Sequence, residues 1–211
     1  MTKKELRRLL IVTTVVMLVP LVVGLIIWPQ LPDQIATHFG VNGQANGWHD
    51  KNKTVFGVPL LMIMIQYICF FSLYFDPSKN NFSKGLFKGL LWIAPIIELI
   101  MMFSIYGIAL GYPLDIGMIV NFVVGLLFIG LGNYLHKVKQ NYTVGIKIPW
   151  TLHSKENWNR THRFAAWLFL IVGIIMMING FFEQTWLLIV PILSIIILPI
   201  GYSFMLYRKG I

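Results

Sequence analysis

The chain of 211 residues is 57% hydrophobic and only 12% charged, and its mean hydropathy is +0.73. This composition excludes an ordinary soluble domain and a disordered chain, and it is typical of a protein that crosses the membrane several times. The net charge of +9 resembles that of a nucleic-acid-binding protein. The placement of the basic residues instead favours membrane topology, so we expect no direct nucleic-acid partner.

Six apolar runs are each long enough to cross the roughly 30 Å hydrocarbon core as a helix. In chain order they are Leu9–Trp28, Phe56–Phe75, Gly89–Leu110, Ile116–Leu135, Phe164–Phe182 and Trp186–Tyr207. The first run lacks the short apolar core and the small-residue cleavage site of a secretory signal, so we expect it to be retained. The sequence therefore predicts an all-α membrane protein with six transmembrane helices that form a single domain over residues 1–211.

The basic residues predict the orientation of these helices. If the N-terminus is cytoplasmic, all but two of the 17 Lys and Arg residues fall on the inner side, the exceptions being Lys51 and Lys53. Cytoplasmic segments of membrane proteins carry such an excess, so both termini are predicted to be cytoplasmic. Basic residues at the inner face would also attract anionic lipids, by roughly 1 kcal/mol each.

The predicted outer loop, residues 29–55, is longer than a simple connection requires. Pro29 and Pro32 should end the first helix. The pairs Asn42-Gly43 and Asn46-Gly47 are turn signals, because both residue types tolerate positive φ. Four side chains supply apolar surface between and beside these turns: Ile35, Phe39, Val41 and Trp48. We therefore expect an ordered outer loop that folds back on the bilayer.

Two polar side chains lie deep within the predicted spans. Glu98 is the only acidic residue there, and a charge at mid-membrane costs at least about 2–3 kcal/mol, so it usually faces the bundle and has a partner. Glu98 is either a proton or ligand site or half of a packing hydrogen bond, for which Asn121 is the candidate partner. Asn121 lies between Gly117 and Gly125 on one helix face, a spacing that allows close helix packing.

The predicted inner loop, residues 136–163, is long and rich in Trp, His, Asn and Gly. A connection between neighbouring helices needs only a few residues, so we expect this loop to carry function. Thr143–Ile148 is β-like and is broken by Gly145, and Pro149 should force an extended backbone at Ile148.

The fifth helix is expected to begin inside this loop, with Ser154 as its N-cap and Glu156 in its first turn. Residues four apart on a helix share a face. One row then comprises Ser154, Trp158, His162 and Ala166, and a neighbouring row that can face water comprises Lys155, Asn159 and Arg163.

The histidines suggest metal chemistry only weakly. His153, Glu156 and His162 could lie near a metal in a membrane hydrolase, but the chain has no HExxH motif. The outer-loop residues that could bind a metal fit no known ligand spacing: Asp33, His38, His49 and Asp50. We predict no metal, no cofactor and no catalytic residue. A metal-dependent membrane hydrolase and a proton-coupled exporter of small molecules or peptides are the alternatives.

Both loops resemble known signatures. In the outer loop, the pattern is a Leu-Pro start, a His-aromatic pair, a Gly, an aromatic residue and a Lys, at Leu31, Pro32, His38, Phe39, Gly43, Trp48 and Lys51. The inner loop resembles the signature of the SdpI family of bacterial immunity proteins. Its matching positions are Val144, Gly145, Ile146, Lys147, Trp150, Thr151, Leu152, Asn157, Trp158, His162 and Arg163.

This resemblance covers nearly the whole chain. It implies a non-enzymatic protein of the bacterial plasma membrane that protects its host against a secreted peptide toxin. It also implies a second role, because some members hold a soluble autorepressor at the membrane when toxin is present. The candidate toxin- or partner-binding residues are His38, Phe39, Gly43, Trp48, Gly145, Lys147, Trp150, Thr151, Asn157, Trp158, His162 and Arg163. Glu98 and Asn121 are candidate intramembrane polar contacts.

Overall fold

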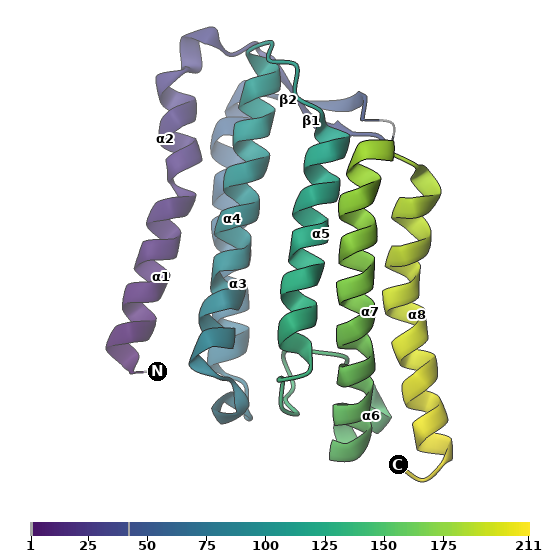
Figure 1. The fold of residues 1–211 in the computed structure, drawn as a ribbon. Helices are drawn as coiled ribbons and strands as arrows, with labels where there is room; N and C mark the ends of the chain where they lie inside the picture. Colours follow the sequence, from purple (N-terminus) through teal and green to yellow (C-terminus); the bar gives the residue numbers. More distant parts are fainter. Residues whose placement is uncertain (1, 42) are drawn as a thin grey trace. The chain divides into compact units, whose positions relative to one another are not determined.

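The computed structural model describes residues 2–41 and 43–211, which are mostly helical (Figure 1). Within these residues, six helical segments are long and apolar enough to cross a membrane. They are Lys3–Ile26, Lys53–Tyr74, Lys84–Ala109, Ile116–Leu135, Lys155–Phe182 and Thr185–Arg208. Each contains most of one predicted apolar run, which confirms the six expected spans. The chain divides into two compact units, Met1–Ser72 with Lys84–Ile116 and Leu73–Ser83 with Gly117–Ile211. The single domain over residues 1–211 stays a prediction.

The first unit contains a span that is divided into two helices. α1 (Lys3–Met17) and α2 (Val19–Ile26) meet at Leu18. Pro20 lies in the first turn of α2, where its missing N–H interrupts the hydrogen-bond ladder. A 3₁₀ turn follows at Trp28–Gln30, so the first helix ends where the two prolines predicted.

The first unit also contains two strands that the sequence did not predict. β1 (Gln34–Phe39) and β2 (Ala45–Asp50) form an antiparallel hairpin with irregular register. The all-α expectation is therefore wrong for this segment. Asn46-Gly47 lies within β2 and is not a turn, because Gly47 pairs with His38 across the hairpin. Gly43 does take a positive φ of 72° at the hairpin tip, whereas Asn42 lies outside the described residues.

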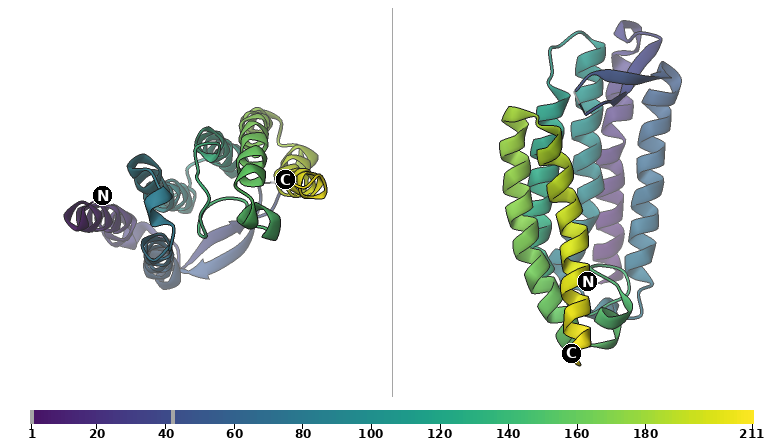
Figure 2. Two further views of the ribbon diagram at one scale, coloured as in Figure 1. Left: turned by 90° about the horizontal axis from the view of Figure 1, so that it is seen from below. Right: turned by 90° about the vertical axis from the view of Figure 1, so that its right-hand side faces the viewer.

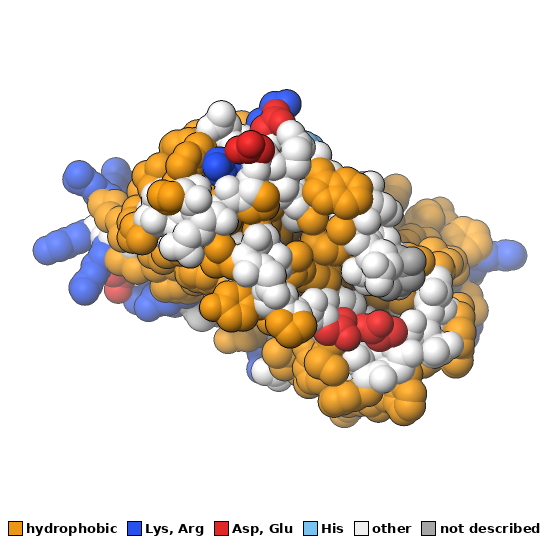
Figure 3. Space-filling view, turned by 90° about the horizontal axis from the view of Figure 1, so that it is seen from above, with side chains coloured by type: hydrophobic (Ala, Val, Ile, Leu, Met, Phe, Trp, Pro, Cys, Tyr) orange, Lys and Arg blue, Asp and Glu red, His pale blue; other side chains and the backbone are white. Residues whose placement is uncertain are grey.

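The hairpin is attached to α4 (Lys84–Ala109) by a hydrophobic cluster. Its buried members are Leu31, Ile35, Val55, Met102, Ile105 and Tyr106. The Tyr106 hydroxyl also donates to the carbonyl of Pro20 at 3.0 Å. A π-helical turn at Lys53–Gly57 then leads into α3 (Val58–Tyr74). Figure 3 looks onto the hairpin end, where acidic and other polar side chains lie among hydrophobic ones.

The second unit is built on α5 (Ile116–Leu135), α7 (Lys155–Phe182) and α8 (Thr185–Arg208). α7 and α8 run side by side (Figure 2) around a core of Val172, Met176 and Ile195. α5 and α7 approach closely at Gly125 and Gly173, where a Cβ atom on either glycine would lie within 2.7 Å of the other's carbonyl oxygen.

An amide pair links the same two helices. Asn179 of α7 donates to the side-chain oxygen of Asn121 at 3.0 Å. The interhelical packing role predicted for Asn121 is confirmed, with Asn179 as its side-chain partner. The glycines on this face bring α5 against α7. Glu98 lies in the first unit, so its suggested pairing with Asn121 stays a prediction.

Candidate functional site

The signature loop, residues 136–163, joins α5 to α7 within the second unit. The expectation of a β-like Thr143–Ile148 is wrong, because this stretch has bends and no strand. Gly145 takes a φ of +117°, which turns the chain away from an extended path. The extended backbone predicted at Ile148 is confirmed, with φ −122° and ψ 159°. Pro149 then opens a short helix, α6 (Pro149–His153), that the sequence did not predict.

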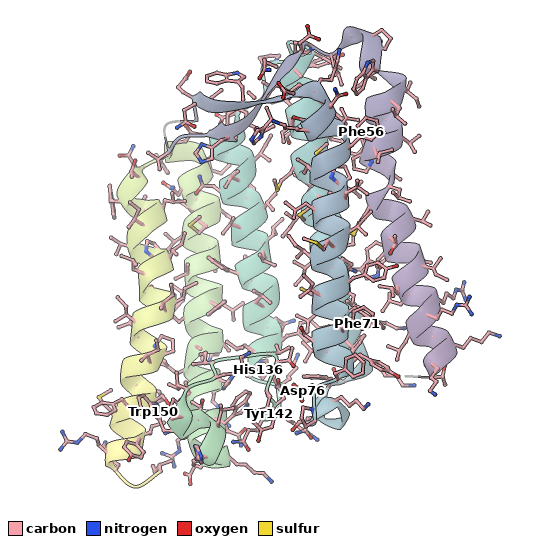
Figure 4. The ribbon with its side chains drawn as sticks, turned by 180° about the vertical axis from the view of Figure 1, so that it is seen from behind. Phe56, Phe71, Asp76, His136, Tyr142 and Trp150 are labelled. Carbon is pink, nitrogen blue, oxygen red and sulfur yellow. The ribbon has the colours of Figure 1, made fainter. Side chains whose placement is uncertain are left out.

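Asp76 lies in the turn that follows α3, and its side chain binds the irregular part of the signature loop. Its side chain is 3% exposed. One carboxylate oxygen accepts hydrogen bonds from the backbone N–H of Tyr142 (3.1 Å) and from the hydroxyl of Thr143, and the other accepts from the N–H of Ser78 (2.6 Å). Figure 4 shows Asp76 and Tyr142 close together at the end of the unit that carries the loop. A buried carboxylate with three donors thus ties the turn after α3 to the signature loop.

Asn141 organises the next residues through its own side chain, which is 1% exposed. Its amide oxygen accepts from the backbone N–H of Thr143 at 2.9 Å and of Val144 at 2.6 Å. Its amide nitrogen donates to the carbonyls of Lys139 at 2.8 Å and of Val144 at 3.0 Å. The Asn141 side chain therefore bonds backbone groups that a neighbouring strand would otherwise bond.

Gln140 connects this stretch to α6. Its amide nitrogen donates to the carbonyls of Thr151 and Leu152 at 2.9 and 2.7 Å. The backbone carbonyl of Gln140 in turn accepts from the Asn81 side chain at 2.6 Å. The end of α6 is therefore linked through Gln140 to the same turn that contains Asp76.

His162 lies under the bend at Gly145, and both of its ring nitrogens are used. Nε2 accepts from the N–H of Ile146 at 3.0 Å, so Nδ1 is the donor to the carbonyl of Trp158 at 2.8 Å. This pattern requires a neutral imidazole. The Trp158 ring is fully buried, stacks on His162 with centroids 4.0 Å apart, and donates to the carbonyl of Val138 at 2.8 Å. A Cβ on Gly145 would collide with the His162 ring.

Two hydroxyl groups fix the start of α6 and of α7. The buried Thr151 hydroxyl accepts from the N–H of Ile148 at 3.0 Å and donates to the carbonyl of Ile146 at 2.8 Å. The Ser154 hydroxyl accepts from the N–H of Asn157 at 3.2 Å, which confirms Ser154 as the N-cap of α7.

Asn157 joins α7 to α8 and to the last residue. Its amide nitrogen donates to the carbonyls of Ser203 at 3.0 Å and of Ile211 at 3.1 Å. Its amide oxygen accepts from the hydroxyls of Ser203 and Thr161. Asn157 is fully buried, so its role in this structure is to hold the helices together.

The two predicted rows on α7 are confirmed. In the first, Trp158, His162 and Ala166 are buried and Ser154 is half-buried. In the second, Lys155, Asn159 and Arg163 are exposed. The signature residues therefore separate into a buried framework and an exposed surface.

Three candidates contribute to that surface. Trp150 is half-buried, stacks on Tyr207 of α8 with centroids 5.7 Å apart, and also packs against Phe204. The Lys147 ammonium is exposed and donates to a loop carbonyl at 3.1 Å. Arg163 is exposed on α7.

The groups considered for a metal do not converge. His162 has no free ring nitrogen, His153 Nδ1 lies 2.6 Å from the carbonyl of Pro149, and Glu156 pairs with Arg160. Throughout residues 2–41 and 43–211, no three His, Cys, Asp or Glu side chains gather as a possible metal site.

The hairpin candidates lie mostly at the surface of the first unit. His38 is exposed and hydrogen-bonds to the side chain of Asn46 across the strands. Trp48 is 54% exposed, Phe39 is half-buried, and Gly43 forms the tip. These residues all lie on one hairpin.

The other cross-strand pairs of the hairpin are also exposed. Thr37 and His49 are 2.8 Å apart. The Gln34 amide donates to Asp50, and this hydrogen bond, with a smaller effect from Lys53, lowers the pKa of that carboxyl below its usual value.

Glu98 lies in α4 and is 1% exposed. Neither carboxylate oxygen has a hydrogen-bond partner within the described residues. Its role as a proton or ligand site stays a prediction.

Four residues of the loop framework were missed in the sequence: Asp76, Gln140, Asn141 and Ser203. Asp76-Pro77-Ser78 carried a signal, because an Asp side chain often accepts from the N–H two residues later. Asn141 makes the same local turn with Thr143. Ser203 lies far along the chain and carried no signal.

Two family models match this chain, one within each of its two compact units. Residues 137–203, which include most of the signature loop, match the model of the SdpI/YfhL protein family. The resemblance to the SdpI family is confirmed. The immunity protein SdpI of Bacillus subtilis (strain 168) is 27% identical over 191 residues, which cover 89% of this chain and 88% of that SdpI protein. Residues 15–63, which include the hairpin, match a domain of unknown function (DUF1648). The chain matches no solved structure.

Proposed function

We propose that this chain is an immunity protein of the bacterial plasma membrane, which protects its host against a secreted peptide toxin without catalysing a reaction. The observation that carries the proposal is the similarity to an immunity protein over 89% of the chain. The family match also falls on residues 137–203, where the buried residues of the signature loop make specific hydrogen bonds.

The proposal includes an orientation with both termini cytoplasmic, the signature loop inside and the hairpin outside. It is supported by the 17 Lys and Arg residues, of which only Lys51 and Lys53 would lie outside. The test uses a Cys69→Ser background, because Cys69 is free and exposed. Val41→Cys should react with a membrane-impermeant maleimide in whole cells, and Lys139→Cys only after the cells are opened. The reverse pattern would contradict the orientation.

In this orientation, toxin would first meet the hairpin. His38 and Trp48 are exposed there, and aromatic side chains often carry much of the energy of protein interfaces. A response on the other side requires two states of the protein that toxin binds with different affinity.

The second role in the proposal is to hold a soluble autorepressor at the inner face. The exposed side chains of the signature loop are the surface available for such a partner, above all Lys147 and Arg163. Arg is enriched among residues that dominate interface energies. Fractionation of cells in the presence and absence of toxin would show whether the repressor moves to the membrane.

Immunity is tested by the survival of a toxin-sensitive bacterium that expresses the chain and is challenged with secreted peptides of neighbouring strains. Wild type should protect and an empty vector should not. Lys147→Gln with Arg163→Gln, inserted at the wild-type level, tests the exposed signature surface. Arg208→Gln with Lys209→Gln removes the same charge from exposed residues outside the signature loop and is the control. Wild type that inserts but protects against no toxin would overturn the proposal.

A further inference from the structure

A polar pocket of about 490 Å³ lies against the signature loop, within the second unit. Its walls come from three segments, which are the turn after α3, the start of the irregular stretch and the first turns of α7. The residues that matter for its chemistry are Ser78, Asn81, Lys139, Tyr142, Lys155 and Asn159. Its size is in the range of small-molecule sites, but such sites are usually mostly apolar, and this one is lined by hydroxyl, amide and ammonium groups.

The charge inside the pocket has one sign. Lys139 comes from the loop and Lys155 from α7, and no acidic side chain is among the described residues of the lining. Neither ammonium forms an ion pair within residues 2–41 and 43–211. Two unpaired lysines on different segments that face one concavity create a positive potential that favours an anion.

The nearby acidic groups are already engaged. Asp76 adjoins the pocket, but its carboxylate accepts from Ser78, Tyr142 and Thr143 and is buried behind them. Glu156 follows Lys155 in sequence but pairs with Arg160. Asp76 keeps its negative charge, but neither it nor Glu156 forms an ion pair with Lys139 or Lys155.

The walls of the pocket are held by the same framework that fixes the loop. Asn81 donates to the carbonyl of Gln140, and the buried Asn141 bonds the backbone on both sides of Tyr142. Figure 4 shows Asp76 and Tyr142 together at this place. The pocket is therefore formed by well-bonded backbone and does not depend on the exposed lysines for its shape.

The position of the pocket along the spans places it where lipid phosphates are one possible source of the anion. Its wall segments directly follow the apolar parts of α3 and α5 and directly precede the apolar part of α7. The ends of apolar helices mark the edge of the hydrocarbon region, where lipid phosphates lie.

We propose that this pocket is a binding site for a phosphate group, in which Lys139 and Lys155 supply the charge and Ser78 and Asn159 supply neutral donors. The phosphate belongs either to an anionic phospholipid headgroup or to a soluble phosphate ester. Ammonium groups bind phosphate as point charges, and the neutral donors provide orientation. The site goes beyond the proposed immunity function and does not depend on it.

The test compares two double variants of the full chain, purified in detergent. Lys139→Gln with Lys155→Gln removes both pocket charges. Lys79→Gln with Lys137→Gln removes the same charge from neighbouring segments outside the pocket, where these lysines lie over the rings of Tyr74 and Tyr134. All four lysines are exposed, so both variants should fold, which is checked by thermal unfolding.

Two probes separate the sources of phosphate. Glycerol 3-phosphate is titrated by calorimetry, and native mass spectrometry counts retained phosphatidylglycerol against zwitterionic phosphatidylcholine. The pocket variant should lose at least about tenfold in affinity for one or both probes, while the control keeps the wild-type value. Loss of phosphatidylglycerol alone assigns a lipid, and loss of glycerol 3-phosphate alone assigns a soluble ester. Equal loss in both variants, or no binding of either probe by wild type, would overturn the proposal.

Discussion

The hairpin and the signature loop are both longer than a simple connection, but they are stabilised in different ways. In the hairpin, the backbones of β1 and β2 pair with each other, and side-chain pairs such as Thr37 with His49 are exposed. In the signature loop, backbone groups are bound by the buried side chains of Asp76, Asn141 and His162. A backbone ladder accepts many sequences, whereas a side-chain framework requires particular residues. Changes in the loop framework should therefore be much more costly.

Asp76→Ala should have the largest effect. It removes the acceptor of three hydrogen bonds and leaves buried donors unsatisfied, so we expect a loss of about 3 kcal/mol in the free energy of unfolding. Denaturant unfolding of the purified protein measures the loss. Asp33→Ala is the control from the hairpin segment, since the Asp33 side chain is 98% exposed and only pairs with Lys51. Equal effects of the two variants would refute the difference between the regions.

Gly145→Ala should cost about 2 kcal/mol, because alanine is strained at positive φ and its Cβ would also meet the His162 ring. Gly111→Ala is the matched control. Gly111 has a φ of +86° but nothing within 4 Å of the added Cβ, so the same unfolding measurement should show a smaller loss. If both variants lose the same amount, the contact with His162 contributes nothing.

Trp158→Phe should cost about 1 kcal/mol, because the carbonyl of Val138 loses its donor while the ring contact with His162 is largely kept. Trp167→Phe is the control on the same helix, where the side chain is 65% exposed. Thermal unfolding of the two variants is compared, and a control that is destabilised as strongly as Trp158→Phe would count against a specific hydrogen bond.

Thr37→Val should have the smallest effect, within about 0.5 kcal/mol of wild type. The change removes the hydroxyl next to His49 but keeps a β-branched side chain on β1. A loss as large as that of Gly145→Ala, measured in the same way, would show that the hairpin also depends on its side-chain pairs.

The sequence predicted what depends on local patterns. The six spans follow from the length of apolar runs, and the N-cap Ser154 follows from its residue type. The buried row of Trp158 and His162 and the packing role of Asn121 follow from spacing along a helix. It did not predict the hairpin, because Asn46-Gly47 has the composition of a turn but pairs with His38 inside a sheet.

The framework of the candidate site was harder to predict because it depends on contacts between residues that are far apart in the sequence. Asp76 and Ser203 act on partners 66 and 46 residues away. Only the fold brings these residues to the loop. The composition of Thr143–Ile148 wrongly predicted a β-like segment. Local composition cannot show that side chains from elsewhere in the chain bind this part of the loop.

Amide hydrogen exchange over residues 139–148 tests the central claim most directly. These residues form no helix or strand, yet the N–H groups of Tyr142, Val144 and Ile146 are bound by Asp76, Asn141 and His162. If buried side chains hold the signature loop, these amides should exchange slowly, at rates comparable to those of the hydrogen-bonded amides of Asn157 and Trp158 in α7. Exchange at the rate of an unstructured peptide would contradict the account, because the loop would then lack the framework to which its function is assigned.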